Sequence, residues 1–125
     1  MQARILIVED QADIRRLIRW ALEDSGYTLH EAANGNLALQ LLPVLVPDIV
    51  LLDVMMPGEI DGYEVCRRIR ANPTLAKTQV VMITAQARNS DHDQAMAAGA
   101  NAFLAKPFSP ARLIELIEEL TSKRS

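Results

Sequence analysis

Acidic side chains follow two apolar stretches of this sequence. Residues 4–8 run directly into Glu9 and Asp10, and residues 49–52 run into Asp53. A short apolar run without alternation is typical of a strand that is buried on both faces of a parallel sheet. Ligands of open α/β sheets bind beyond the carboxyl ends of such strands. The carboxylates therefore either cap turns and helices or form the centre of a site.

Two more polar residues follow apolar stretches. Thr84 ends residues 79–84, and Lys106 follows residues 102–105. Carboxylates that converge repel one another, and a hard divalent cation such as Mg²⁺ relieves that repulsion through oxygen ligands. An ionised Asp53 could then attack a phosphoryl group, while Lys106 and Thr84 contact the phosphoryl oxygens. Taken singly, threonine is common at strand ends and lysine is usually solvated, so only the full set favours a site.

The elements that must position these residues alternate along the chain. Strands are expected at residues 4–8, 27–32, 49–53, 79–84 and 102–105, and helices at 13–25, 37–42, 63–71, 91–98 and 110–120. This alternation predicts an α/β fold, a doubly wound (βα)5 parallel sheet with helices on both faces. In the flavodoxin-like strand order 2-1-3-4-5 the first and third strands are neighbours, and the carboxylates then converge.

A few residues make local predictions. Pro43 interrupts the second helical pattern, and because proline removes a helical hydrogen bond and clashes with the preceding turn, we expect the helix to kink or stop there. Gly26 is expected to end the first helix in the left-handed conformation, and Asn34-Gly35 is expected to form a turn. Cys66 is expected in the core. Trp20 lies off the buried stripe of its helix and is expected to be partly exposed.

Composition narrows the class of protein. The 125 residues suit one domain, predicted to span 1–125. A net charge of −3 does not favour nucleic acid, which would ask for a basic face. No apolar run approaches the ~20 residues of a membrane span, so no membrane partner is expected. No signal-peptide pattern follows the first residues, and the single cysteine excludes an internal disulfide. We expect a cytoplasmic location.

The ordered motifs resemble a known family. Glu9-Asp10, Asp53-x-x-Met56-Pro57, Thr84-Ala85 and Lys106-Pro107 are similar in type, order and spacing to the receiver domains of bacterial two-component response regulators. The resemblance covers essentially the whole chain. It implies a Mg²⁺ cofactor and a phosphoryl group accepted from the phosphohistidine of a histidine kinase. Its implied partners are a sensor kinase or phosphotransfer protein and a downstream target or output domain.

The resemblance also assigns the acceptor and metal ligands. It implies that Asp53 is the phosphoacceptor and that Asp10 binds the metal directly, whereas Glu9 acts mostly through water. Asp53 itself and the backbone carbonyl of Met55 complete the ligands from the protein. One departure lies beside them, because residues 57–62 contain one residue more than the usual family loop, which could alter the rim of the site.

The remaining roles concern the phosphoryl group and the switch. The resemblance implies that Thr84 and Lys106 contact the phosphoryl group and that the Lys106–Pro107 peptide bond is cis. It also makes Thr84 and Phe103 the switch residues. Their movement would alter the face made by the fourth helix, fifth strand and fifth helix, which could also form a homodimer. From the sequence alone, a core role is the better interpretation of Phe103, and its switch role comes only from the resemblance.

Two other functions compete with this one. A phosphatase with an aspartate nucleophile typically carries a second aspartate two residues later as general acid–base, and Met55 stands there instead. A receiver-shaped binding module that is never phosphorylated usually lacks one of the site residues, and none is missing here. We therefore expect a switch and not an enzyme. At most, this switch would catalyse its own phosphoryl transfer and dephosphorylation.

Overall fold

The computed structural model describes residues 3–85 and 89–122, without the side chains of 89–91. The described chain forms one parallel sheet in the order β2-β1-β3-β4-β5, which confirms the predicted strand order. Its strands are β1 (Arg4–Val8), β2 (Thr28–Ala32), β3 (Ile49–Asp53), β4 (Gln79–Thr84) and β5 (Ala102–Ala105). Its helices are α1 (Ala12–Leu22), α2 (Gly35–Leu45), α3 (Gly62–Ala71), α4 (Asn89–Ala97) and α5 (Pro110–Ser122), with short 3₁₀ turns at Glu23–Ser25 and Pro73–Leu75.

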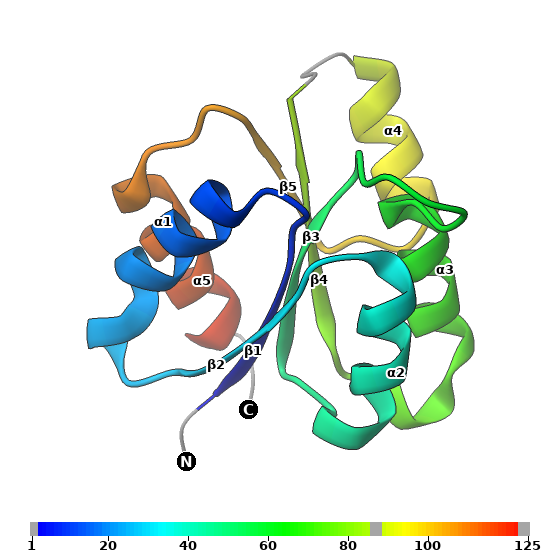
Figure 1. The fold of residues 1–125 in the computed structure, drawn as a ribbon, viewed down its shortest axis with the longest axis horizontal. Helices are drawn as coiled ribbons and strands as arrows, with labels where there is room; N and C mark the ends of the chain where they lie inside the picture. The colour runs from blue at the N-terminus through cyan, green and yellow to red at the C-terminus, as the bar shows by residue number, and fades with distance from the viewer. Residues whose placement is uncertain (1–2, 86–88, 123–125) are drawn as a thin grey trace.

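Helices cover both faces of the sheet. Figure 1 shows α1 and α5 on one side and α2, α3 and α4 on the other. Side chains of one strand alternate between the two sides, so Ile5 and Ile7 join the core under α1 and α5, whereas Leu6 and Val8 join the core under α2 and α3. All five residues of β3 are buried, as expected for a central strand covered on both faces.

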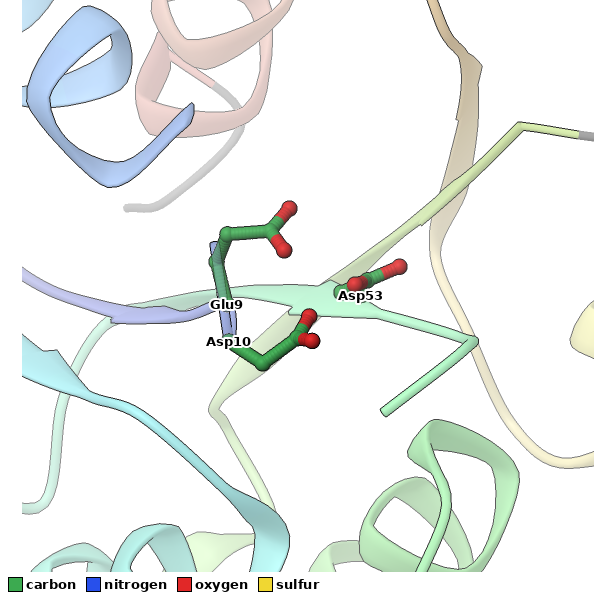
Figure 2. A group of neighbouring side chains, drawn as sticks. All are labelled: Glu9, Asp10 and Asp53. Carbon is green, nitrogen blue, oxygen red and sulfur yellow. The ribbon is translucent and has the colours of Figure 1, made fainter. Parts of the chain in front are cut away.

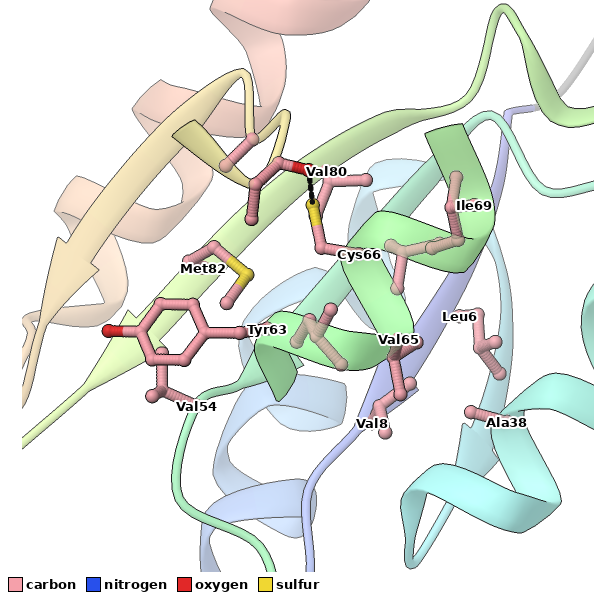
Figure 3. Packing of buried hydrophobic residues seen from close by; sticks show 14 of the residues in the cluster. Leu6, Val8, Ala38, Val54, Tyr63, Val65, Cys66, Ile69, Val80 and Met82 are labelled. Carbon is pink, nitrogen blue, oxygen red and sulfur yellow. Dashed lines mark hydrogen bonds between the residues drawn. The ribbon is translucent and has the colours of Figure 1, made fainter. Parts of the chain in front are cut away.

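The core under α3 is continuous with the end of α4. Val65, Cys66 and Ile69 of α3 are fully buried in the same core as Val8 and Val80, and Figure 3 shows this packing. Burying an aliphatic side chain of this size contributes roughly 1.5–3 kcal/mol. The Cys66 thiol donates a 3.4 Å hydrogen bond to the carbonyl of Ala98, and burial raises the pKa of this thiol. Cys66 is thus a core residue, as its sequence position predicts.

Helix α2 does not stop at Pro43. The helix continues to Leu45 with Pro43 inside it, so of the two expected outcomes, a kink or a stop, the stop was wrong. Proline removes one N–H, but Leu42 is fully buried and Leu45 packs against the same core, which favours another half turn. Val46 caps the C-terminal end of the helix: its N–H donates to the Leu42 carbonyl, and its φ is 43°.

Other helix ends follow their sequence signals with small shifts. Gly26 adopts the left-handed conformation expected of it, with φ of 82°. Asn34 is not part of a free turn, because its side chain accepts a 2.8 Å hydrogen bond from the N–H of Leu37 and caps α2. Trp20 is 63% exposed, as predicted. Among the described residues, no helix is both long enough and apolar enough to span a bilayer.

Candidate functional site

Strands β1 and β3 end side by side. Their register pairs Val8 with Leu52, so the residues that follow emerge at the same edge of the sheet. The backbone after β1 is held by two hydrogen bonds: the Glu9 N–H donates to the carbonyl of Ala32, and the Arg15 guanidinium donates to the carbonyl of Glu9. The chain therefore presents Glu9 and then Asp10 beside the end of β3, where Asp53 lies.

Three carboxylates meet at this edge. Glu9, Asp10 and Asp53 each offer an oxygen, and these oxygens lie within 4.8 Å of one another. Figure 2 shows the three carboxylates extending into the space beyond the strand ends. Glu9 and Asp53 are almost fully buried, whereas Asp10 is partly exposed. Three hard oxygen donors around one point, with one side open to solvent, are a donor set that suits Mg²⁺ together with several waters.

Lys106 reaches the same cluster from the end of β5. Its ammonium lies 2.8 Å from Glu9 Oε1 and 3.6 Å from Asp53 Oδ2. The Lys106 N–H donates to the carbonyl of Thr84, and the Lys106–Pro107 peptide bond is cis. Three carboxylates and one ammonium leave an excess of two negative charges if all are ionised. A divalent cation would neutralise that excess.

The surroundings of Asp53 oppose its ionisation. They raise the pKa of Asp53 from its ordinary value of 3.8 to about 7. Burial is the largest cause, followed by the hydrogen bond and the negative charge of Glu9, while Lys106 and the Met55 N–H act in the opposite direction. The Met55 N–H donates to Asp53 Oδ1 at 3.2 Å. A cation beside Asp53 would hold it in the ionised form that a nucleophile needs.

Thr84 and Phe103 lie along the neighbouring strands. Thr84 ends β4, is buried, and pairs in register with Ala105, the residue before Lys106. Phe103 on β5 is half-buried against the core on the α2, α3 and α4 side. Its ring meets the imidazole of His92 on α4 edge to face, with the ring centres 5.6 Å apart. Thr84 is thus at the edge that holds the carboxylates, and Phe103 on β5 contacts α4 through His92.

A family model for the response regulator receiver domain matches residues 5–118. This chain belongs to that family. Its sequence is 39% identical over 124 residues to the transcriptional regulatory protein ResD of Bacillus subtilis, covering 99% of this chain and 50% of ResD. It is 40% identical over 121 residues to the response regulator PleD of Caulobacter vibrioides, covering 97% of this chain and 26% of PleD.

Solved structures agree with this assignment. The chemotaxis protein CheY4 of Vibrio cholerae superposes with a TM-score of 0.90 at 29% identity, over 96% of this chain and 99% of CheY4. The receiver chain described here therefore spans half of ResD and about a quarter of PleD, but nearly all of CheY4. The resemblance of its motifs to receiver domains is confirmed, and so is the receiver fold.

Two contacts in this receiver, one at Gly62 and one at His92, became visible only in the structure. Gly62 opens α3 against the backbone of β3: a Cβ there would overlap the carbonyl of Asp53 and lie 2.8 Å from the Cα of Val54. Its N–H donates to the Val54 carbonyl. The Asp-Gly pair at 61–62 is a visible helix-start signal, but its closeness to the site depends on the fold. Sequence reasoning also missed the contact of His92 with Phe103, which joins residues on separate elements.

Proposed function

We propose that this receiver domain is a phosphorylation-controlled switch, in which Asp53 takes a phosphoryl group from the phosphohistidine of a partner histidine kinase or phosphotransfer protein. The observation that supports this most strongly is the convergence of carboxylate oxygens from Glu9, Asp10 and Asp53 within 4.8 Å, beside the Lys106 ammonium. A buried charge cluster of this kind is costly for stability, which is typical of a functional site.

The transfer exchanges one bond for another. An oxygen of the Asp53 carboxylate attacks the phosphorus, and a P–O bond forms as the P–N bond to the donor imidazole breaks. The electron pair of that bond returns to the imidazole nitrogen, which takes a proton from solvent. The product is an acyl phosphate on Asp53, and no general acid is required on the aspartate side.

The residues around Asp53 have separate tasks. Glu9, Asp10, Asp53 and the Met55 carbonyl would hold Mg²⁺, which when bound supplies positive charge to the acceptor carboxylate and the phosphoryl oxygens. Lys106 places a second positive charge at the same point, since its ammonium already lies 3.6 Å from Asp53 Oδ2. Loss of one Glu9 contact would free that ammonium for the phosphoryl group.

The output is a change of binding surface. In this proposal the new charge on Asp53 draws Thr84 toward the phosphoryl group, and Phe103 follows into the space that Thr84 leaves. The surface formed by α4, β5 and α5 then changes its affinity for a downstream protein, an output domain or a second copy. The receiver acts as a cytoplasmic signalling component and not as a turnover enzyme.

Mass spectrometry of the intact protein tests the proposal. Incubation with Mg²⁺ and acetyl phosphate should add one phosphoryl group to the wild type and none to Asp53→Asn. A matched control, Asp24→Asn, changes an exposed aspartate in the 3₁₀ turn after α1 and should be phosphorylated like the wild type. EDTA should abolish the reaction.

The competing functions give different results. A wild-type protein that stays unmodified, both with acetyl phosphate and with phosphorylated histidine kinase, would support a binding module that is never phosphorylated. Release of free phosphate over many turnovers would support a phosphatase. We expect the acyl phosphate on Asp53 to persist, because Met55, two residues later, offers no acid–base group.

A further inference from the structure

Glu9 is tied to the edge strand β2 through both of its peptide groups. Its N–H donates a 3.1 Å hydrogen bond to the carbonyl of Ala32, the last residue of β2. Its carbonyl, which belongs to the peptide bond leading to Asp10, accepts a 2.7 Å hydrogen bond from Arg15 Nη1. Glu31, which precedes Ala32 on β2, holds the same guanidinium: its Oε1 lies 3.2 Å from Arg15 Nε. The chain that presents two of the three carboxylates is therefore fixed to β2.

Arg15 is placed to set the direction of that chain. Its side chain lies on α1 and is only 21% exposed. A guanidinium carries its N–H donors in one rigid plane, and Arg15 uses two of them at once, one on Glu31 and one on Glu9. A charged donor also makes a stronger hydrogen bond to a carbonyl than a neutral donor does. Because Glu31 holds the guanidinium, the position of the Glu9 carbonyl is held with it.

The direction of this peptide bond decides where both acidic side chains begin. Glu9 and Asp10 are consecutive, and their oxygens come within 4.8 Å of an oxygen of Asp53 from a separate strand. A ligand set for Mg²⁺ tolerates little error, since this ion asks for near-octahedral geometry at about 2.1 Å. Groups that orient metal ligands typically contribute about 10–100-fold to metal affinity. A residue that fixes the Glu9 carbonyl can therefore control how well the site binds a cation.

Arg19, one turn further along α1, offers a comparison within the same helix. Its Nε lies 2.6 Å from Glu31 Oε2, and its Nη2 donates to the carbonyl of Leu29 at 3.3 Å. Leu29 lies three residues before the end of β2, about 10 Å from that end at ~3.3 Å per residue. Two arginines thus share one carboxylate. Arg15 uses its second contact on Glu9, whereas Arg19 uses its second contact on the body of β2.

Two other roles for Arg15 predict different results. As a brace between α1 and β2, it would contribute to stability and leave the metal affinity of the folded protein unchanged. As a positive charge near three carboxylates, it would oppose the binding of a second cation, so its removal would tighten Mg²⁺ binding. Only a positioning role predicts that Mg²⁺ binding weakens when the guanidinium is removed.

We propose that Arg15 is a positioning residue for the metal site. It orients the peptide bond between Glu9 and Asp10 so that both side chains face the space beyond the end of β3. The guanidinium acts through the Glu9 carbonyl and does not itself coordinate the ion or touch the phosphoryl group. This role rests on the proposed function, since the site that Arg15 serves is the Mg²⁺ site of that switch.

Isothermal titration calorimetry of the purified receiver with Mg²⁺, without phosphodonor, tests this role. Arg15→Met keeps the length of the side chain and removes every donor, so it should bind Mg²⁺ about tenfold more weakly than the wild type. Arg15→Lys keeps the charge but loses the rigid plane of donors, and it should also bind more weakly. Far-UV circular dichroism should show both variants folded, because Glu31 keeps its contact with Arg19.

Arg19→Met is the matched control. It removes an equal charge from the same helix and from the same partner, Glu31. The Arg19 side chain is 42% exposed, so its charge is well screened and this variant should bind Mg²⁺ within about twofold of the wild type. Equal or tighter Mg²⁺ binding by Arg15→Met overturns the positioning role, and so does an equal weakening in Arg19→Met.

The Mg²⁺ dependence of phosphorylation by acetyl phosphate gives a second measurement. The half-saturating Mg²⁺ concentration should rise about tenfold in Arg15→Met. A merely structural loss would lower the rate at every Mg²⁺ concentration without moving that midpoint, and this result would overturn the positioning role. A wild type that binds no Mg²⁺ overturns the positioning role together with the proposed switch. A wild type that binds Mg²⁺ but takes no phosphoryl group contradicts the switch alone, and calorimetry still decides the role of Arg15.

Discussion

The Lys106 ammonium lies closer to Glu9 than to the proposed phosphoacceptor: Nζ is 2.8 Å from Glu9 Oε1 and 3.6 Å from Asp53 Oδ2. Both carboxylates are nearly buried, so the strength of each contact depends strongly on distance in a medium of low polarity. Glu9 therefore takes most of the neutralising effect of Lys106. Lys106 therefore offsets only part of the cost of burying a negative charge on Asp53, which is consistent with the raised pKa of Asp53.

Removing the charge of Glu9 should lower the pKa of Asp53. In Glu9→Gln, both the negative charge and the carboxyl partner that raise this pKa are lost, and Lys106 becomes free to approach Asp53. Burial, the largest cause, remains, so the pKa should fall below about 7 but stay above the ordinary 3.8. Carbon-detected NMR of the metal-free protein, titrated from acid to alkaline pH, measures it. An Asp53 pKa that is unchanged or higher in Glu9→Gln would contradict this account.

The stability of the metal-free receiver should depend on pH through Asp53. The folded-state pKa of Asp53 is raised, to about 7 from 3.8, so the folded protein holds a proton that the unfolded chain releases. This contribution to stability is fully present below pH 4, declines as pH rises toward 7, and is absent above it. Urea denaturation in EDTA should therefore give a lower free energy of unfolding at pH 8 than at pH 5.

Asp53→Asn isolates this contribution from the other titrating groups. The variant cannot ionise at residue 53, so its stability should fall less than that of the wild type between pH 5 and pH 8. Saturating Mg²⁺ should restore stability to the wild type at pH 8, because a ligand of the folded state alone stabilises it. Equal pH dependence in the two proteins would show that Asp53 is not the group responsible.

Asp10 should matter for metal binding more than for the fold. It is the partly exposed member of the carboxylate cluster, so it faces the open side where a hydrated ion would enter. Asp10→Asn should weaken Mg²⁺ binding at least tenfold, about 1.4 kcal/mol, as measured by isothermal titration calorimetry. Asp24→Asn changes an exposed aspartate in the turn after α1 and should bind Mg²⁺ like the wild type. Equal affinities for the two variants would exclude Asp10 as a ligand.

The sequence predicted the parts of the fold that depend on short-range patterns. The apolar runs before Glu9 and Asp53 predict two strands, and the alternation of elements predicts a parallel sheet, in which the structure places these two strands side by side. Their carboxyl ends share an edge, so the meeting of these carboxylates follows once the strand order is known. The strand order itself rested on resemblance to receivers.

The features that sequence reasoning missed depend on distant residues. Pro43 stays within α2 because the buried Leu42 and its neighbours outweigh the loss of one hydrogen bond, a balance that local propensity does not contain. The edge contact between His92 and Phe103 joins two elements whose relative position only the fold determines. The roles of Thr84, Lys106 and Phe103 in phosphoryl transfer and switching stay predictions.

Gly62, the first residue of α3, packs against the backbone of Asp53, the proposed phosphoacceptor. A Cβ at this residue would overlap the Asp53 carbonyl and press on the Cα of Val54, both in buried backbone that cannot yield easily. Gly62→Ala should therefore lower the free energy of unfolding by about 2 kcal/mol or more. It should also slow phosphorylation by acetyl phosphate, because the strain falls on Asp53 itself.

Gly35→Ala is the matched control for Gly62→Ala. Gly35 and Gly62 are each the first residue of a helix, so the gain in helix propensity from alanine is similar in both. A Cβ at Gly35 would meet the carbonyl of Ile60 at 2.9 Å, but Ile60 lies in a loop that can shift. Gly35→Ala should thus cost less stability and leave the rate of phosphorylation nearly unchanged. If Gly62→Ala were as stable and as rapidly phosphorylated as Gly35→Ala, the contact with Asp53 would not constrain the site.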